Sequence, residues 1–174
     1  MKIEMRKIEF HQTVSIQMYL EAISFYESAK VIKDSIGDSS MYYEKYPYYV
    51  MLSFSIELLL KCIHVTSVIE IDDSREETLS SKINHINGHR LDEIFDRHSD
   101  KMKRFLSNAY EIKFNRSLRD DLICNGNVFT KFRYTYPRDG NGSSEKSLYP
   151  DILEDTALFM VEEIKALYDK QSGR

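Results

Sequence analysis

Two charged residues lie inside a long apolar stretch of the sequence, and they are its first candidates for chemistry. Between positions 48 and 69 the only full charges are Glu57 and Lys61. They are four residues apart and so share one side of a helix. One interpretation is an ordinary i,i+4 ion pair with both charged ends at the surface. The other is a buried polar seam, which survives only with good geometry and further hydrogen bonds.

His89, Arg133 and Tyr134 are the groups that we expect to supply those further hydrogen bonds, because a buried charge without partners is costly. With Glu57 and Lys61 they would form one polar network that locks the fold and presents a ligand-binding face. A third interpretation is a small-ligand pocket around the pair itself.

Other chemistry-bearing motifs are missing from the sequence. There is no glycine-rich phosphate loop, no HExxH, no paired-cysteine motif and no nucleophile elbow. The five histidines do not fall at metal-ligand spacings, so we expect neither a metal site nor a cofactor. Cys62 and Cys124 are most simply reduced thiols of a cytoplasmic protein. The first ten residues are charged throughout and are not a secretory signal.

Length and composition are those of one ordinary globular domain, 1–174. Hydrophobic residues make up 42% of the chain, charged residues 30%, and the net charge is -4. Charge is uneven, however: positions 97–138 hold ten Lys or Arg and four Asp or Glu, a balance of +6, so the rest carries -10. Such a segment could face RNA or a nucleotide, or could simply be a solvated helix face.

The elements that must position these residues are helices. The apolar spacing predicts long helices over 13–36, 48–69, 100–114 and 151–168, with a short helix after Gly88. The 48–69 helix is apolar nearly all round and should be the buried centre of a bundle. A membrane span there would place Glu57 and Lys61 in lipid, at roughly 2.5–3.5 kcal/mol each, so we expect no membrane association. The predicted fold is all-α, an up-and-down bundle of four to five helices.

Two segments leave their structure open. Positions 128–137 are rich in aromatic and β-branched residues and predict a short extended arm or hairpin near 128–137. The tyrosines at 42, 43, 46, 48 and 49 crowd the start of the central helix. They suit either an interface or the edge of the core.

Three segments, SIELLLKCI, GHRLDEIF and KFRYTYP, occur in this order and resemble HEPN (higher eukaryotes and prokaryotes nucleotide-binding) domains. The resemblance spans roughly 48–136, and the flanking helices would complete the HEPN-like bundle. It implies a dimeric, intracellular protein. Many members are metal-independent ribonucleases of phage defence or toxin–antitoxin systems, whereas others are non-catalytic partners of nucleotidyltransferases or other effectors.

The family's catalytic motif, Arg followed after four to six residues by His, is absent, since no histidine follows His98. The nearest match in shape, Arg119 followed by Asn125, lacks a group that can move a proton. If the chain is a metal-independent endoribonuclease, Arg133 and His89 are the catalytic pair that we expect, brought together in space or across a homodimer. Glu57, Lys61, Tyr134 and Arg119 are then binding or polar-network residues.

Two functions therefore stay open. One is a defence or toxin–antitoxin type protein that acts on RNA, which predicts that the basic segment gathers beside Arg133 and His89. The other is a non-catalytic dimeric module that docks a nucleotidyltransferase or another effector. That module predicts an apolar or tyrosine-rich patch on the surface.

Overall fold

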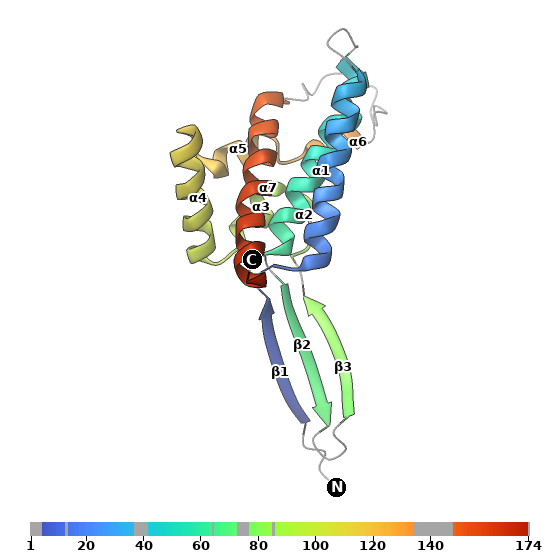
Figure 1. The fold of residues 1–174 in the computed structure, drawn as a ribbon, viewed down its shortest axis with the longest axis vertical. Helices are drawn as coiled ribbons and strands as arrows, with labels where there is room; N and C mark the ends of the chain where they lie inside the picture. The colour runs from blue at the N-terminus through green and yellow to red at the C-terminus, as the bar shows by residue number, and fades with distance from the viewer. Residues whose placement is uncertain are drawn as a thin grey trace, which may run out of the picture.

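The computed structural model describes residues 5–12, 14–36, 42–63, 65–72, 77–84, 86–133 and 148–173. Figure 1 shows two parts: a bundle of helices, and a sheet that extends from one end of it. The long helices are α1 (Ile16–Ile36), α2 (Tyr46–Cys62), α4 (Asp100–Phe114) and α7 (Pro150–Ser172). Shorter helices are the 3-10 helix η1 (Tyr42–Lys45), α3 (Leu91–Asp96), α5 (Leu118–Cys124) and α6 (Val128–Arg133).

Helix α2 is the centre of the bundle, as the sequence predicts. It packs against α1, α3, α6 and α7. Leu52, Ile56, Leu59 and Leu60 on this helix are all buried. Ala22 of α1 is fully buried too, and its carbonyl accepts a hydrogen bond from the Ser55 hydroxyl of α2 at 2.8 Å. A helix with apolar residues on most sides needs neighbours on most sides, and α2 has them.

The predicted helical bundle is confirmed, but the chain is not helical throughout. The 48–69 helix ends at Cys62, and positions after it form strand β2 (Val65–Asp72). This strand lies between β1 (Met5–Gln12) and β3 (Glu77–Asn84) in an antiparallel sheet of order β1-β2-β3. Valine, threonine and isoleucine dominate β2, and β-branched residues favour strands over helices. Because the apolar run 48–69 continues through both elements, its pattern did not indicate where helix α2 ends and strand β2 begins.

The extended arm or hairpin expected near 128–137 is also wrong for 128–133, which form helix α6. Phe132 on this helix is buried and meets the Tyr46 ring edge-on at 4.7 Å. Contact with α2 therefore overrides the β-propensity of these aromatic residues. Positions 134–137 lie outside the described residues.

Short loops and caps set the path between the smaller helices. Ser99 and Ser117 cap α4 and α5 by accepting hydrogen bonds from the backbone N–H groups of Met102 and Asp120. Gly126, between α5 and α6, lies against α3: a Cβ at this position would be 2.8 Å from Asp92 Oδ1.

None of the helices in the described ranges is both long and apolar enough to cross a membrane.

Candidate functional site

The candidate site is built on Glu57, which faces the interior of the bundle near the end of α2. Its carboxylate is only 1% exposed. Lys61, one turn later on the same helix, donates a hydrogen bond from Nζ to Glu57 Oε1 at 2.7 Å, and its side chain is 10% exposed. The two residues thus form the buried polar seam, one of the two interpretations that the sequence left open.

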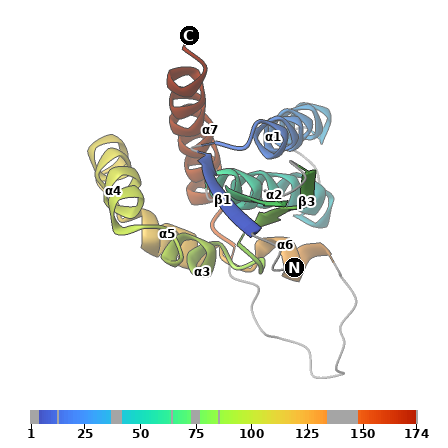
Figure 2. The ribbon, with the colours of Figure 1, turned by 90° about the horizontal axis from the view of Figure 1, so that it is seen from below.

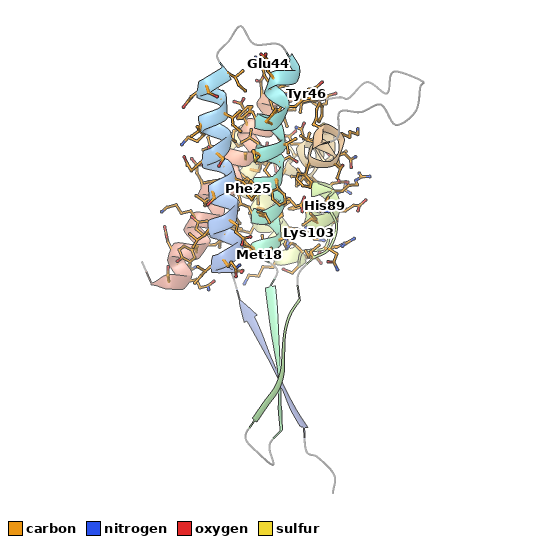
Figure 3. The ribbon with its side chains drawn as sticks, turned by 90° about the vertical axis from the view of Figure 1, so that its right-hand side faces the viewer. Met18, Phe25, Glu44, Tyr46, His89 and Lys103 are labelled. Atoms are coloured by element: carbon orange, nitrogen blue, oxygen red, sulfur yellow. The ribbon has the colours of Figure 1, made fainter. Side chains whose placement is uncertain are left out.

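His89 is the second partner of Glu57. Its Nδ1 lies 3.0 Å from Glu57 Oε1 and 3.2 Å from Oε2. An ionised carboxylate can only accept hydrogen bonds, so Nδ1 carries the proton in this contact. The imidazole is 54% exposed, which leaves Nε2 as the nitrogen available to a ligand. Figure 3 shows His89 on the side of α2 that faces away from α1.

Aromatic packing and a glycine hold the imidazole in place. Its ring lies 5.4 Å from the ring of Phe129 on α6, which stacks at 4.6 Å on Phe54 of α2. Gly88, directly before His89, has a φ of +102°, a conformation that side chains with a Cβ rarely adopt. The turn therefore needs this glycine to bring His89 back towards α2.

This arrangement is suited to proton transfer. A neutral imidazole whose Nδ1–H is held by a carboxylate presents Nε2 as a base, and the carboxylate stabilises the imidazolium that forms when Nε2 takes a proton. Lys61 keeps the buried Glu57 carboxylate paired with a cation whether His89 is neutral or protonated.

Arg133 and Tyr134 are not placed as fully. Arg133 is the last residue of α6, one helical turn beyond Phe129, but the structure describes only its backbone. Tyr134 lies outside the described residues. The structure thus brings Glu57, Lys61 and His89 together and places the Arg133 backbone one turn from the ring that packs on His89.

Arg119 is not part of this cluster. It lies on α5 and donates from Nε and Nη2 to the two carboxylate oxygens of Asp96 at 2.9 and 2.8 Å. This hydrogen bonding holds the pKa of Asp96 below its usual value. The pair joins α5 to α3, and we assign it no contact with the Glu57 site.

The basic residues of the 97–138 segment are spread over several elements: some lie on α4 and α5, whereas Lys131 and Arg133 lie on α6, which packs beside His89. Several of those on α4 and in the loop after it have acidic partners: Lys103 pairs with Asp100, Lys113 with Glu162, and Arg116 with Asp121 and Asp155. Figures 1 and 2 show α4 and α6 on opposite sides of the bundle. Part of the positive charge of the segment is therefore balanced by acidic residues inside and outside it.

The tyrosine cluster is divided by the fold. Tyr48 and Tyr49 are buried in the core, so these two residues do not contribute to an exposed docking patch. Tyr46 packs against Phe132, and the side chains of Tyr42 and Tyr43 are not among those described. Of the two interpretations of the tyrosine cluster, an interface or the edge of the core, the second is therefore correct for Tyr48 and Tyr49.

Sequence reasoning missed a second polar cluster, which joins α4, α5 and α7. The Tyr110 hydroxyl donates to Asp121 Oδ2 at 2.6 Å, and Arg116 donates from Nε to the same oxygen at 2.9 Å. Arg116 also donates from Nη2 to Asp155 at 2.8 Å. Tyr110 is fully buried, and its hydrogen bonds fasten these helices together. Sequence reasoning also missed Phe129, because the place of this residue beside His89 depends on 128–133 being a helix.

The described part of the chain contains no group of three His, Cys, Asp or Glu side chains placed to hold a metal ion. Comparison of the chain with protein-family models, with curated proteins and with solved structures finds no match. The residues of the site and the motif resemblance are therefore what indicate a function for this chain.

Proposed function

We propose that this protein is a HEPN-like, metal-independent endoribonuclease of a defence or toxin–antitoxin type system, with His89 as its acid–base residue. The single observation that carries the proposal is the contact between the buried Glu57 carboxylate and Nδ1 of the exposed His89 imidazole. A histidine so oriented is the group that RNA cleavage without a metal ion needs.

The reaction follows from the free nitrogen of His89. Nε2 removes the proton from a ribose 2′-hydroxyl, and the resulting oxygen attacks the adjacent phosphorus. The bond from phosphorus to the 5′-oxygen breaks, that oxygen takes a proton from water, and the products are a 2′,3′-cyclic phosphate and a 5′-hydroxyl. Glu57 acts through His89, since it orients the ring and stabilises the imidazolium, and is therefore a positioning residue.

Arg133 is the residue that we assign to the phosphate. Its backbone is one turn from Phe129, which packs on His89. Consecutive turns of a helix are about 5.4 Å apart, which is the offset between Phe129 and Arg133 along α6. An arginine at this end of the helix would stabilise the negative charge that develops on the phosphate during attack.

The test is cleavage of varied RNAs by purified protein with a chelator present. We expect wild-type cleavage to survive chelation, and His89→Ala to slow it by about 10²–10⁴-fold, the usual contribution of acid–base catalysis. Arg133→Ala should slow it by about 10²-fold or more, as loss of one charge-stabilising group does.

Lys131→Ala is the matched control for Arg133→Ala, because it removes an exposed cation from the same helix two residues earlier. We expect it to cleave at close to the wild-type rate. Circular dichroism would establish that each variant keeps its helices. Cleavage unchanged in the folded His89→Ala variant would overturn the site assignment.

The alternative is the non-catalytic module that docks a nucleotidyltransferase or another effector, again as a homodimer. The observation in its favour is that Lys113, Arg116 and Arg119 are engaged in ion pairs and do not form an open basic surface for RNA. No cleavage of any RNA, together with no salt-dependent RNA binding, would support this module over the nuclease.

A further inference from the structure

A row of aromatic rings runs through the bundle and ends at His89. Phe25 of α1 meets Phe54 of α2 edge-on, with 4.5 Å between the ring centroids. Phe54 stacks on Phe129 of α6 at 4.6 Å, and the His89 ring lies 5.4 Å beyond Phe129. Figure 3 shows the two ends of this row, Phe25 and His89, on opposite sides of α2. The row therefore joins three helices to the candidate acid–base residue.

Phe129 lies against the imidazole in an arrangement that is nearer to stacked than to edge-on. The planes of the two rings differ by 35°. Phe129 is 8% exposed, whereas the imidazole is 54% exposed. The phenylalanine ring is thus part of the close-packed core, and the surface imidazole rests on it.

The orientation of Phe129 is itself fixed by its neighbours. Its ring and that of Phe54 are 15° from parallel, and Phe25 contacts Phe54 with an angle of 76° between the ring planes. Stacked and edge-on contacts are the two favoured geometries of aromatic pairs, and they stabilise a pair beyond the area that it buries. Rotation of the Phe129 ring would break the stacked contact with α2.

The hydrogen bond to Glu57 fixes only one atom of the His89 ring. Nδ1 lies 3.0 and 3.2 Å from the two carboxylate oxygens. A carbonyl-type oxygen accepts hydrogen bonds over a broad range of directions, so this contact places Nδ1 and still allows the ring to tilt. A catalytic group must be held within about 0.5 Å and 10–20° of its working geometry. The ring therefore needs a second contact, on its face.

We propose that Phe129 is a second positioning residue of this site, which fixes the plane of the His89 ring and so the direction of Nε2. The proposal rests on the proposed role of His89 as the acid–base residue. An aromatic ring suits this position for a further reason: a cation within about 6 Å of a ring centroid is attracted to the ring, and the imidazolium formed during the reaction lies within that distance. An aliphatic side chain would fill the space without this attraction.

Steady-state cleavage of an RNA by the full chain, with chelator present, is the first test. Phe129→Leu fills most of the space but has no ring. We expect its kcat to fall by about 10–100-fold, as small misplacements of a catalytic group do, with KM within about threefold of wild type. Phe129→Tyr keeps the ring and should have a kcat within about threefold of wild type.

Phe132→Leu is the matched control. Phe132 lies on the same helix and is 3% exposed, but its ring meets Tyr46 edge-on at 4.7 Å. Both leucine variants should lower the midpoint of thermal unfolding by similar amounts, since each removes a buried ring from α6. Only Phe129→Leu should slow cleavage by 10-fold or more, because only that change removes the ring beside His89.

A second test needs no RNA. In the full chain labelled with ¹³C at histidine, the ring signals of His89 are identified by their loss in His89→Ala. The ring current of Phe129 should displace these signals from the positions of an unfolded histidine. They should move towards those positions in Phe129→Leu and stay in place in Phe129→Tyr and Phe132→Leu.

Unchanged His89 signals in a folded Phe129→Leu variant would overturn the proposal. So would a wild-type kcat in that variant, or a Phe132→Leu variant that is equally slow. A wild-type chain that cleaves no RNA would overturn the proposed function instead. The His89 signals would then still decide whether Phe129 fixes the ring.

Discussion

The candidate site depends on a buried carboxylate that has two partners. Glu57 is 1% exposed and receives hydrogen bonds from Lys61 and His89. Removing an ion from water is costly, and only good geometry with further hydrogen bonds offsets that cost. Lys61 supplies the balancing charge, and His89 supplies the hydrogen bond that connects this interior charge to the surface.

Lys61→Met tests the energetic part of this description. The change keeps the aliphatic stem but leaves Glu57 without its cation, and breaking a buried pair in this way costs about 3–5 kcal/mol. Because Lys61 is slightly exposed, we expect a loss of about 3 kcal/mol in the free energy of unfolding, measured by urea denaturation.

Lys165→Met is the matched control. Lys165 and Asp169 are also four residues apart on a helix, at 2.7 Å, but their side chains are 62% and 33% exposed. Such pairs contribute about 0.3–0.5 kcal/mol, so this variant should unfold at nearly the wild-type urea concentration. Equal effects of the two substitutions would show that burial of the Glu57 pair has no energetic weight.

Sequence reasoning reached Glu57, Lys61 and His89 for identifiable reasons. The helix that carries Glu57 and Lys61 has few positions that can face solvent, so its charges were expected to have partners inside the protein. The Gly-His motif indicated His89 as one of those partners. It could not foresee that Arg119 would pair with Asp96 on α3. Ion-pair partners distant in sequence depend on how helices are arranged, which local spacing does not encode.

At the scale of elements, the long helices were predictable and the strands were not. The ends of α1 and α4 lie close to those that the apolar periodicity indicates, since one buried stripe per helix repeats every three or four residues. At Cys62 the chain changes from helix to strand without a Gly or Pro to mark it. Only the β-branched residues of β2 signal the change, and a continuous apolar run is ambiguous between the two structures.

The loop between α5 and α6 gives a prediction at this scale. Gly126→Ala should destabilise the fold by about 1–3 kcal/mol, the usual cost of overpacking. The added Cβ would lie 2.8 Å from Asp92 Oδ1 and 3.0 Å from the Leu122 carbonyl oxygen. Thermal unfolding followed by circular dichroism measures the effect. An unchanged midpoint would mean that α3 is not held against this loop.

At the scale of the whole molecule, buried phenols link the helices and make the fold sensitive to alkali. Burial raises the pKa of Tyr19, Tyr26, Tyr48 and Tyr110. The folded state thus favours the neutral phenols, whereas the unfolded chain ionises them near the ordinary pKa of about 10. Their contribution to stability is complete below that pH and is lost as pH rises towards the folded pKa values.

We therefore expect the urea concentration at half-unfolding to fall between about pH 9 and 11, measured by circular dichroism. Tyr19→Phe removes one of the phenols and should make the fall shallower. A midpoint that is constant across this range would contradict the raised pKa values of these four tyrosines.

A double-mutant cycle on the rate of RNA cleavage, with chelator present, tests whether Glu57 acts through His89. We predict that Glu57→Gln slows cleavage at least about 10-fold, that His89→Ala slows it by about 10²–10⁴-fold, and that the double variant is no slower than His89→Ala alone. Residues that act as a unit behave in this non-additive way. A folded Glu57→Gln variant at the wild-type rate, or a double variant slower than His89→Ala by the full Glu57→Gln factor, would contradict the account.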